Sequence, residues 1–231
     1  HTAAIFHGQR WEYYYVSIAD LKRAKRESTS FGYKPVNYPA IVWPKWSDVT
    51  DFIQMAMRPD QRWCLDLETR GGWIACVGLS YGSSPRDIHT LCVPIQTTTG
   101  PYWTAVEEAT FWRLLGTLMR RNPNLVGQNL FGFDLDFLFD YGCEPSGVYM
   151  DTMSAFALLH PELPKALDFL VSLHGSLHYY KMESKTWNAG MPDDQLFTYN
   201  TKDTFSTLEI SWAAEANLRE AGLWDLYNHY V

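Results

Sequence analysis

The chain has 231 residues, of which 46% are hydrophobic and 16% aromatic, and its formal charge is −7 at pH 7. This composition supplies a sizeable core for one large domain and excludes an intrinsically disordered chain. No apolar run is long enough to span a bilayer, so no membrane partner is expected. The negative charge argues against a broad surface that coats nucleic acid, but it allows a local basic groove beside an acidic metal site.

The pattern of apolar residues divides the chain at about residue 38. Residues 1–38 are predicted to be an N-terminal extension of uncertain role, with a short strand at 13–16 and a helix at 18–27. Beyond it, strands are predicted at residues 40–43, 62–67, 73–81, 87–95, 125–129 and 148–150, and helices at 48–58, 105–121, 133–141, 152–159, 165–173 and 194–221. Residues 39–231 are therefore predicted to form one α/β domain, a mixed β-sheet flanked by α-helices.

The four cysteines lie at positions 64, 76, 92 and 143, and no two form a C-x-x-C pair. Three of them stand in apolar, strand-like runs, so buried and reduced thiols are expected. Reduced thiols indicate the cytoplasm or another reducing intracellular compartment, which would also suit a viral protein acting in a host cell.

Asp66 and Glu68 are two carboxylates on one predicted strand, separated only by Leu67. Side chains at positions i and i+2 of a strand point to the same face. Two adjacent anions on a mostly apolar strand are costly unless a cation compensates them, and Mg²⁺ prefers such oxygen ligands. A strand end that enters the turn at residues 69–72 is the alternative explanation, so carboxylates elsewhere in the chain decide between the two.

Two further segments carry carboxylates in suitable local structure. Asp134 is predicted near the start of a helix that follows an apolar strand, where the helix dipole favours negative charge. Tyr199 and Asp203 are four residues apart on a predicted helix, which places them on one face. Each feature alone has an ordinary explanation, as an acid in a first helical turn or a surface hydrogen bond.

Together the three motifs resemble those of the DEDD exonuclease superfamily. They are D-x-E on a strand, N-x-x-x-F-D at a strand-to-helix junction and Y-x-x-x-D on a late helix; the tyrosine is typical of the DEDDy branch. Four more stretches, at residues 127–130, 150–153, 165–170 and 222–227, resemble the 3′→5′ proofreading domain of family A DNA polymerases. The resemblance covers about residues 40–231. It implies a ribonuclease H-like fold and an excised or stand-alone exonuclease, with a polymerase domain as partner in the same or another chain.

The resemblance also implies a mechanism. The family hydrolyses phosphodiester bonds at the 3′ end of single-stranded or frayed DNA with two divalent ions, Mg²⁺ or Mn²⁺. By this resemblance Asp66 bridges both ions, and Glu68 and Asp203 complete the site of the ion that activates water. Asp134 supports the second ion, and Tyr199 orients the attacking water.

The residues that contact the substrate are expected to be Asn129, Phe133, Trp73 and Lys165. Many family A members have two residues between the asparagine and the aromatic residue of the second motif, whereas this chain has three, which puts the role of Asn129 in question. Relatives carry an apolar wedge where this chain has Gly71 and Gly72, so Trp73 is expected either to take that role or to be buried in its strand. Phe133 would stack on a base and Lys165 would meet a phosphate.

Two alternatives remain open at the level of sequence. A 3′→5′ exoribonuclease of the ribonuclease D type shares the same order of motifs. A non-catalytic exonuclease-like module that only binds strands, or packs against a polymerase, would keep the fold without the chemistry.

Overall fold

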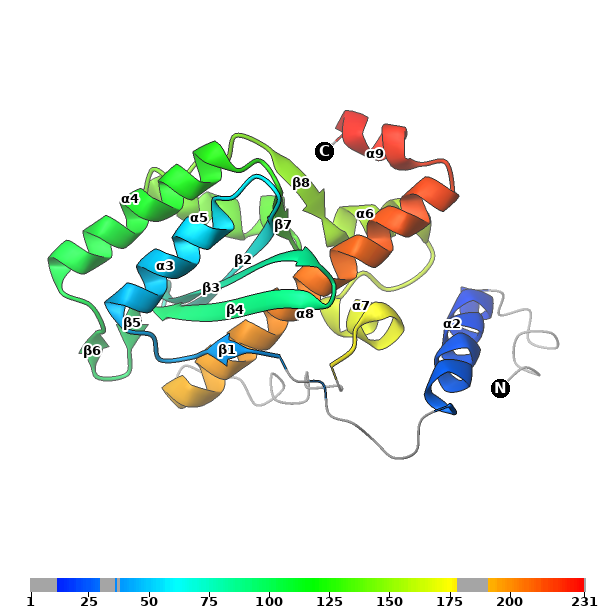
Figure 1. Cartoon of the computed structure of the whole chain (residues 1–231), viewed down its shortest axis with the longest axis horizontal. Helices are drawn as coiled ribbons and strands as arrows, with labels where there is room; N and C mark the ends of the chain where they lie inside the picture. The colour runs from blue at the N-terminus through cyan, green and yellow to red at the C-terminus, as the bar shows by residue number, and fades with distance from the viewer. Residues whose placement is uncertain (1–11, 30–35, 37, 178–190, 231) are drawn as a thin grey trace.

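The computed structural model describes residues 12–29, 36, 38–177 and 191–230. Its centre is a six-stranded sheet with the order β1-β4-β3-β2-β7-β8 (Figure 1). The strands are β1 (Ala40–Ile41), β2 (Arg62–Arg70), β3 (Trp73–Ser84), β4 (Asp87–Pro94), β7 (Leu125–Gly127) and β8 (Val148–Asp151). Strands β2, β3 and β4 form an antiparallel meander, while β1 joins β4, and β7 and β8 extend β2, in parallel. The predicted mixed sheet is confirmed. A separate two-stranded ribbon joins β5 (Gln96–Thr97) to β6 (Gly100–Pro101).

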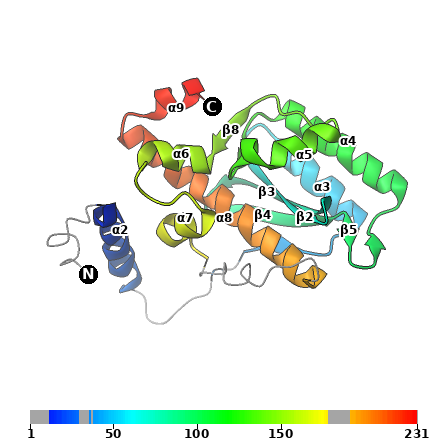
Figure 2. The ribbon, with the colours of Figure 1, turned by 180° about the vertical axis from the view of Figure 1, so that it is seen from behind.

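Helices pack on both faces of the sheet. Figure 1 shows α3 and α4 in front of it and α8 behind, and Figure 2 shows α8 from its own side. The helices are α2 (Glu12–Glu27), α3 (Trp46–Ala56), α4 (Ala105–Arg121), α5 (Asp134–Asp140), α6 (Thr152–Leu159), α7 (Leu167–His174), α8 (Asp193–Glu220) and α9 (Trp224–Tyr230). None of them, within the described part of the chain, has the length and apolarity needed to cross a bilayer.

The alternation of side chains along β2 assigns its residues to two different cores. Trp63, Leu65 and Leu67 are buried against α3, α4 and α5. Cys64 points the other way, into the core formed with α6, α7 and α8. Because successive strand residues alternate, Asp66 and Glu68 share the face of Cys64 and are directed towards α8.

Two ion pairs tie α8 to β2 at opposite ends. Arg62 at the start of β2 pairs with Glu215 near the end of α8, and Arg70 at the end of β2 pairs with Asp193 at the start of α8. The side chains of all four residues are less than one-fifth exposed, so solvent screens these pairs less than it screens surface pairs. The two pairs, together with the buried apolar residues of α8, hold the helix along β2.

The N-terminal segment differs from its sequence prediction. Residues 13–16, predicted as a strand, are part of α2. This helix lies against the domain: Arg23 Nη1 donates a hydrogen bond to Ser172 O at 3.1 Å, and the Tyr15 hydroxyl lies 3.2 Å from His174 Nε2. The domain boundary at residue 38 stays a prediction. The prediction for the cysteines is confirmed, since Cys64, Cys76, Cys92 and Cys143 are all buried and free.

Candidate active site

Three of the predicted ligands meet on the α8 face of the sheet. Asp66 and Glu68 extend from β2 and are half-buried, and Asp203 extends from α8 and is 5% exposed. One carboxylate oxygen from each lies within 4.8 Å of the others. The pairing of β2 with β3 shifts register immediately after Glu68, a bulge that ends the regular ladder beside the site. Three carboxylates at this separation fit a hard divalent cation such as Mg²⁺ or Mn²⁺.

Tyr199 lies one helical turn before Asp203 on α8 and is 8% exposed. Its ring belongs to the core between the sheet and helices α6, α7 and α8. Packing therefore fixes the ring, and the spacing of four residues directs the phenol to the same side of α8 as the Asp203 carboxylate.

Asp134 reaches the same region from a third element, the first residue of α5. It is 3% exposed, and its Oδ1 accepts a hydrogen bond of 2.9 Å from the backbone N–H of Leu67. Leu67 is the residue between Asp66 and Glu68, so Asp134 lies beside the three-carboxylate group without being one of its members. Burial raises the pKa of the Asp134 carboxyl to about 7; the N–H groups of Leu67 and of Asp134 itself oppose the rise, and the charge of Asp151 adds to it. A bound cation would favour the ionised form of this carboxyl.

The raised pKa predicts how the stability of the metal-free protein depends on pH. Because the pKa of Asp134 rises from 3.8 to about 7 on folding, its contribution to stability is fully present below pH 3.8 and is lost as the pH rises to about 7. The loss amounts to about 4 kcal/mol at most, on the order of 1.4 kcal/mol for each pH unit. Asp134→Asn keeps an acceptor for Leu67 and has no carboxyl to ionise, so its stability relative to wild type should increase over this range.

Urea unfolding in the presence of a chelator, from about pH 4.5 to 7.5, measures this difference. Asp140→Asn, on the exposed side of the same helix, controls for the loss of a carboxylate from α5. A difference between Asp134→Asn and wild type that stays constant with pH would show that folding does not shift the Asp134 pKa.

The four carboxylates lie close enough to two buried thiols to raise the pKa of each. Burial, followed by the negative charges of Asp66, Asp134 and Asp203, raises the pKa of the Cys64 thiol well above its usual range. Burial and the neighbouring Cys92, followed by Glu68 and Asp66, have the same effect on the pKa of Cys76. All four predicted carboxylates therefore contribute negative potential to one small region of the fold.

The extra residue in the second motif is accommodated by a 3₁₀ turn, η1 (Leu130–Gly132). Asn129 enters this turn in the left-handed region, at φ 60°, and a side chain on Gly132 would collide with the Asn129 amide. Asp151, for which the sequence predicted no role, stabilises this turn. Its Oδ2 accepts a 2.8 Å hydrogen bond from Leu130 N. Asp151 N in turn donates to the Tyr227 hydroxyl of α9 at 2.8 Å. Asp151 lies in a stretch quoted for the family resemblance, which was its only sequence signal.

The four predicted substrate contacts differ in accessibility. Trp73 is 71% exposed, which excludes the alternative of a buried strand residue. Phe133 is 38% exposed, and its ring lies 5.0 Å from that of Phe137. Asn129 is exposed at the start of η1. Lys165 Nζ donates to the carbonyl oxygens of Pro161 and Leu163, so its ammonium group already stabilises its own loop.

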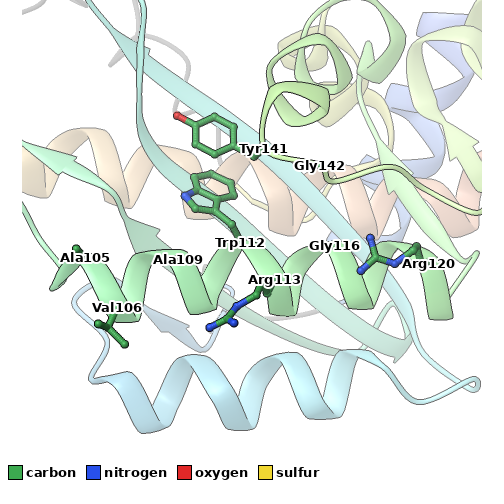
Figure 3. Close-up of a pocket in the computed structure, with 9 residues that line it drawn as sticks. All are labelled: Ala105, Val106, Ala109, Trp112, Arg113, Gly116, Arg120, Tyr141 and Gly142. Atoms are coloured by element: carbon green, nitrogen blue, oxygen red, sulfur yellow. The ribbon is translucent and has the colours of Figure 1, made fainter.

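A separate hollow of about 670 Å³ lies along α4 and the end of α5 (Figure 3). The rings of Trp112 and Tyr141 stack at its wall, with centroids 4.1 Å apart, and Arg113 and Arg120 of α4 also line it. None of the predicted site residues lines this hollow. The stacked rings fasten the end of α5 onto α4 and so support the helix that carries Asp134.

The sheet order, with helices on both faces, defines a ribonuclease H-like fold. No protein-family model and no curated protein matches the sequence. A mutant of the catalytic core of RRP6 from Trypanosoma brucei aligns over 85% of this chain and 52% of its own, with 16% identity and a TM-score of 0.60. A nuclease solved in its apo form aligns over 83% of this chain and 86% of its own, with 14% identity and a TM-score of 0.54. A protein from Bifidobacterium adolescentis aligns over 83% and 46%, with 16% identity and a TM-score of 0.53. This chain thus spans about half the length of the RRP6 chain, and the likeness at these identities concerns the fold.

Proposed function

We propose that the protein is a divalent-metal-dependent 3′→5′ exonuclease that removes nucleotides from the ends of single strands. The observation that carries the proposal is the group of Asp66, Glu68 and Asp203, whose carboxylate oxygens lie within 4.8 Å of one another. Tyr199 on the same helix and Asp134 beside the group complete the set of residues that the sequence resemblance requires. A nuclease among the structures of similar fold lends further support.

Each residue of the candidate site would have a separate role in the hydrolysis. Asp66, Glu68 and Asp203 would hold two divalent ions, with Asp134 alongside. When bound, such ions supply activation of water and stabilisation of the charge on the leaving 3′ oxygen. Tyr199 positions the water by a hydrogen bond from a phenol that the core keeps in place. Asp134 also fixes the peptide between Asp66 and Glu68 through its hydrogen bond with Leu67 N.

We further propose DNA as the substrate, specifically the frayed 3′ end met in proofreading during replication, with a polymerase domain in the same or another chain as partner. This part rests on the sequence resemblance to family A polymerases at residues 127–130, 150–153, 165–170 and 222–227. The alternative is an exoribonuclease with the same order of motifs, and the assay must distinguish the two activities.

The test uses DNA and RNA oligonucleotides of one sequence, labelled at either the 3′ or the 5′ end, with Mg²⁺, Mn²⁺ or a chelator. The expected result is stepwise shortening of 5′-labelled single-stranded DNA and immediate release of a 3′ label, both abolished by the chelator. Faster digestion of RNA would overturn the choice of DNA. Absence of metal-dependent hydrolysis on both polymers would overturn the enzymatic proposal in favour of a binding module.

Trp73 is expected to contact the terminal bases, because an indole that is 71% exposed at the β2–β3 turn is available for stacking. Trp73→Ala should raise the KM for a single-stranded oligonucleotide about tenfold, since stacking contributes about 1–3 kcal/mol per base. The free energy of unfolding should change by less than about 0.5 kcal/mol. Phe139→Ala, another exposed aromatic at 49%, is the control, and an equal rise in KM for it would count against a specific role of Trp73.

A further inference from the structure

Helix α8 comes so close to β3 at Gly78 that a side chain there would displace those of Asn200 and Thr204. A Cβ atom at this position would lie 2.4 Å from Asn200 Oδ1 and 2.8 Å from Thr204 Cγ2. Gly78 is also the residue that pairs with Asp66 across the β2–β3 ladder. The missing side chain of Gly78 therefore provides the space in which Asn200 lies next to Asp66.

From this position Asn200 holds Asp66 at two points. Its Nδ2 donates a 2.7 Å hydrogen bond to Asp66 Oδ2 and a 3.2 Å hydrogen bond to Asp66 O. Asn200 is fully buried, so water does not compete for these bonds. A donor that is hydrogen-bonded to both the carboxylate and the backbone carbonyl of one residue restricts the rotation of that carboxylate.

The second polar atom of the Asn200 amide is its oxygen, Oδ1, which does not contribute to holding Asp66. Asn200 Oδ1 is buried without a hydrogen-bond partner in the part of the chain that the structure describes. A buried acceptor without a partner lowers stability. Rotating the amide by half a turn would not relieve the cost, because its oxygen would then face two oxygens of Asp66. An asparagine at this position therefore lowers the stability of the fold, but its amide orients the Asp66 carboxylate.

We infer that Asn200, seated on Gly78, is a positioning residue that orients the Asp66 carboxylate for the divalent ions. The inference rests on the proposed function, in which Asp66 would be one of the carboxylates that hold the divalent ions. A neutral amide suits this task, because a lysine or arginine would neutralise Asp66 and compete with the ions for it. Outer-shell groups that orient metal ligands commonly affect ion affinity by about 10- to 100-fold.

The test measures Mn²⁺ binding by calorimetry in the absence of nucleic acid. Asn200→Leu has nearly the same shape as asparagine, lacks the donor and removes the unpaired acceptor. It should unfold at the same or higher urea concentration than wild type, yet bind Mn²⁺ about 10- to 100-fold more weakly. Asn200→Ala should lose the same affinity with some loss of stability. In hydrolysis assays the loss should appear as a higher Mn²⁺ requirement, with an unchanged KM for the oligonucleotide.

Asn122→Ala is the matched control. Asn122 is also a buried asparagine, 1% exposed, and its Nδ2 donates to Ala56 O and Gln61 O away from the site. Its replacement should lower stability and leave Mn²⁺ affinity unchanged. Wild-type Mn²⁺ affinity in Asn200→Leu would overturn the inference, whatever the behaviour of Asn200→Ala. A wild-type protein that binds Mn²⁺ but hydrolyses nothing would overturn the proposed function alone, and one that binds no Mn²⁺ would overturn both.

Discussion

Replacing Asp66 and Glu68 together by alanine should reduce metal-dependent hydrolysis at least about 10³-fold. The two side chains supply two of the three carboxylates that lie within 4.8 Å of one another, and both come from one strand. Without them a divalent ion has only Asp203 in that group, and the several kcal/mol of transition-state stabilisation that metal catalysis provides is lost. The measurement is the rate of shortening of a 5′-labelled single-stranded oligonucleotide at saturating Mg²⁺.

The effect must come from the site and not from unfolding. Mg²⁺ at about 100 times its dissociation constant should stabilise the wild-type protein by about 2.7 kcal/mol and leave the double variant unchanged. A charge-matched control is Asp136→Ala with Asp140→Ala, because both carboxylates are exposed on α5. This control should retain both hydrolysis and the response to Mg²⁺. Wild-type rates in the Asp66→Ala, Glu68→Ala protein would disprove the assignment of the active site.

Asp203→Ala and Tyr199→Phe should separate the role of a ligand from that of a water-orienting group. Asp203→Ala removes the only carboxylate that α8 contributes to the group, so a loss of at least about 10³-fold is expected, with weak binding of Mn²⁺. Tyr199→Phe deletes one hydroxyl and keeps the ring in its core, so a loss of about 10- to 100-fold is expected, with Mn²⁺ affinity unchanged. Equal losses in the two variants would indicate that Tyr199 acts by supporting the structure.

The sheet was predictable because its strands contain apolar runs that are separated by turns with glycine and proline. Residues 74–80 of β3 are all buried, as a strand covered on both faces requires, and α4 spans the predicted 105–121. The strand predicted at 13–16 failed because aromatic and β-branched residues favour strands only by a weak propensity that tertiary contacts override. In the structure the ring centroids of Tyr15 and His160 lie 3.8 Å apart, and this contact with the residue that follows α6 is not encoded in the local sequence.

The residue types of the candidate site were predictable from the sequence, whereas their arrangement in space was not. Residue spacing placed Asp66 and Glu68 on one strand face and Tyr199 with Asp203 on one helix face. Their meeting depends on how α8 lies on β2, which apolar packing and the ion pairs at Arg62 and Arg70 determine together. The role of Asn200 depends on the close approach of α8 to Gly78, a contact between segments far apart in the chain. The left-handed backbone conformation of Asn129 could not be predicted from the sequence either, because the φ angle of a single residue leaves no periodic pattern.

The separation of the three carboxylates along the chain has a consequence for a protein that is still being synthesised. Asp66 and Glu68 belong to β2, while Asp203 belongs to α8, which follows every strand of the sheet. Translation adds about 5–20 residues each second, so several seconds pass between the emergence of the first two carboxylates and the third. During that interval a nascent chain attached to its ribosome carries an incomplete ion site. The proposed nuclease would therefore have no complete ion site until α8 has docked on β2.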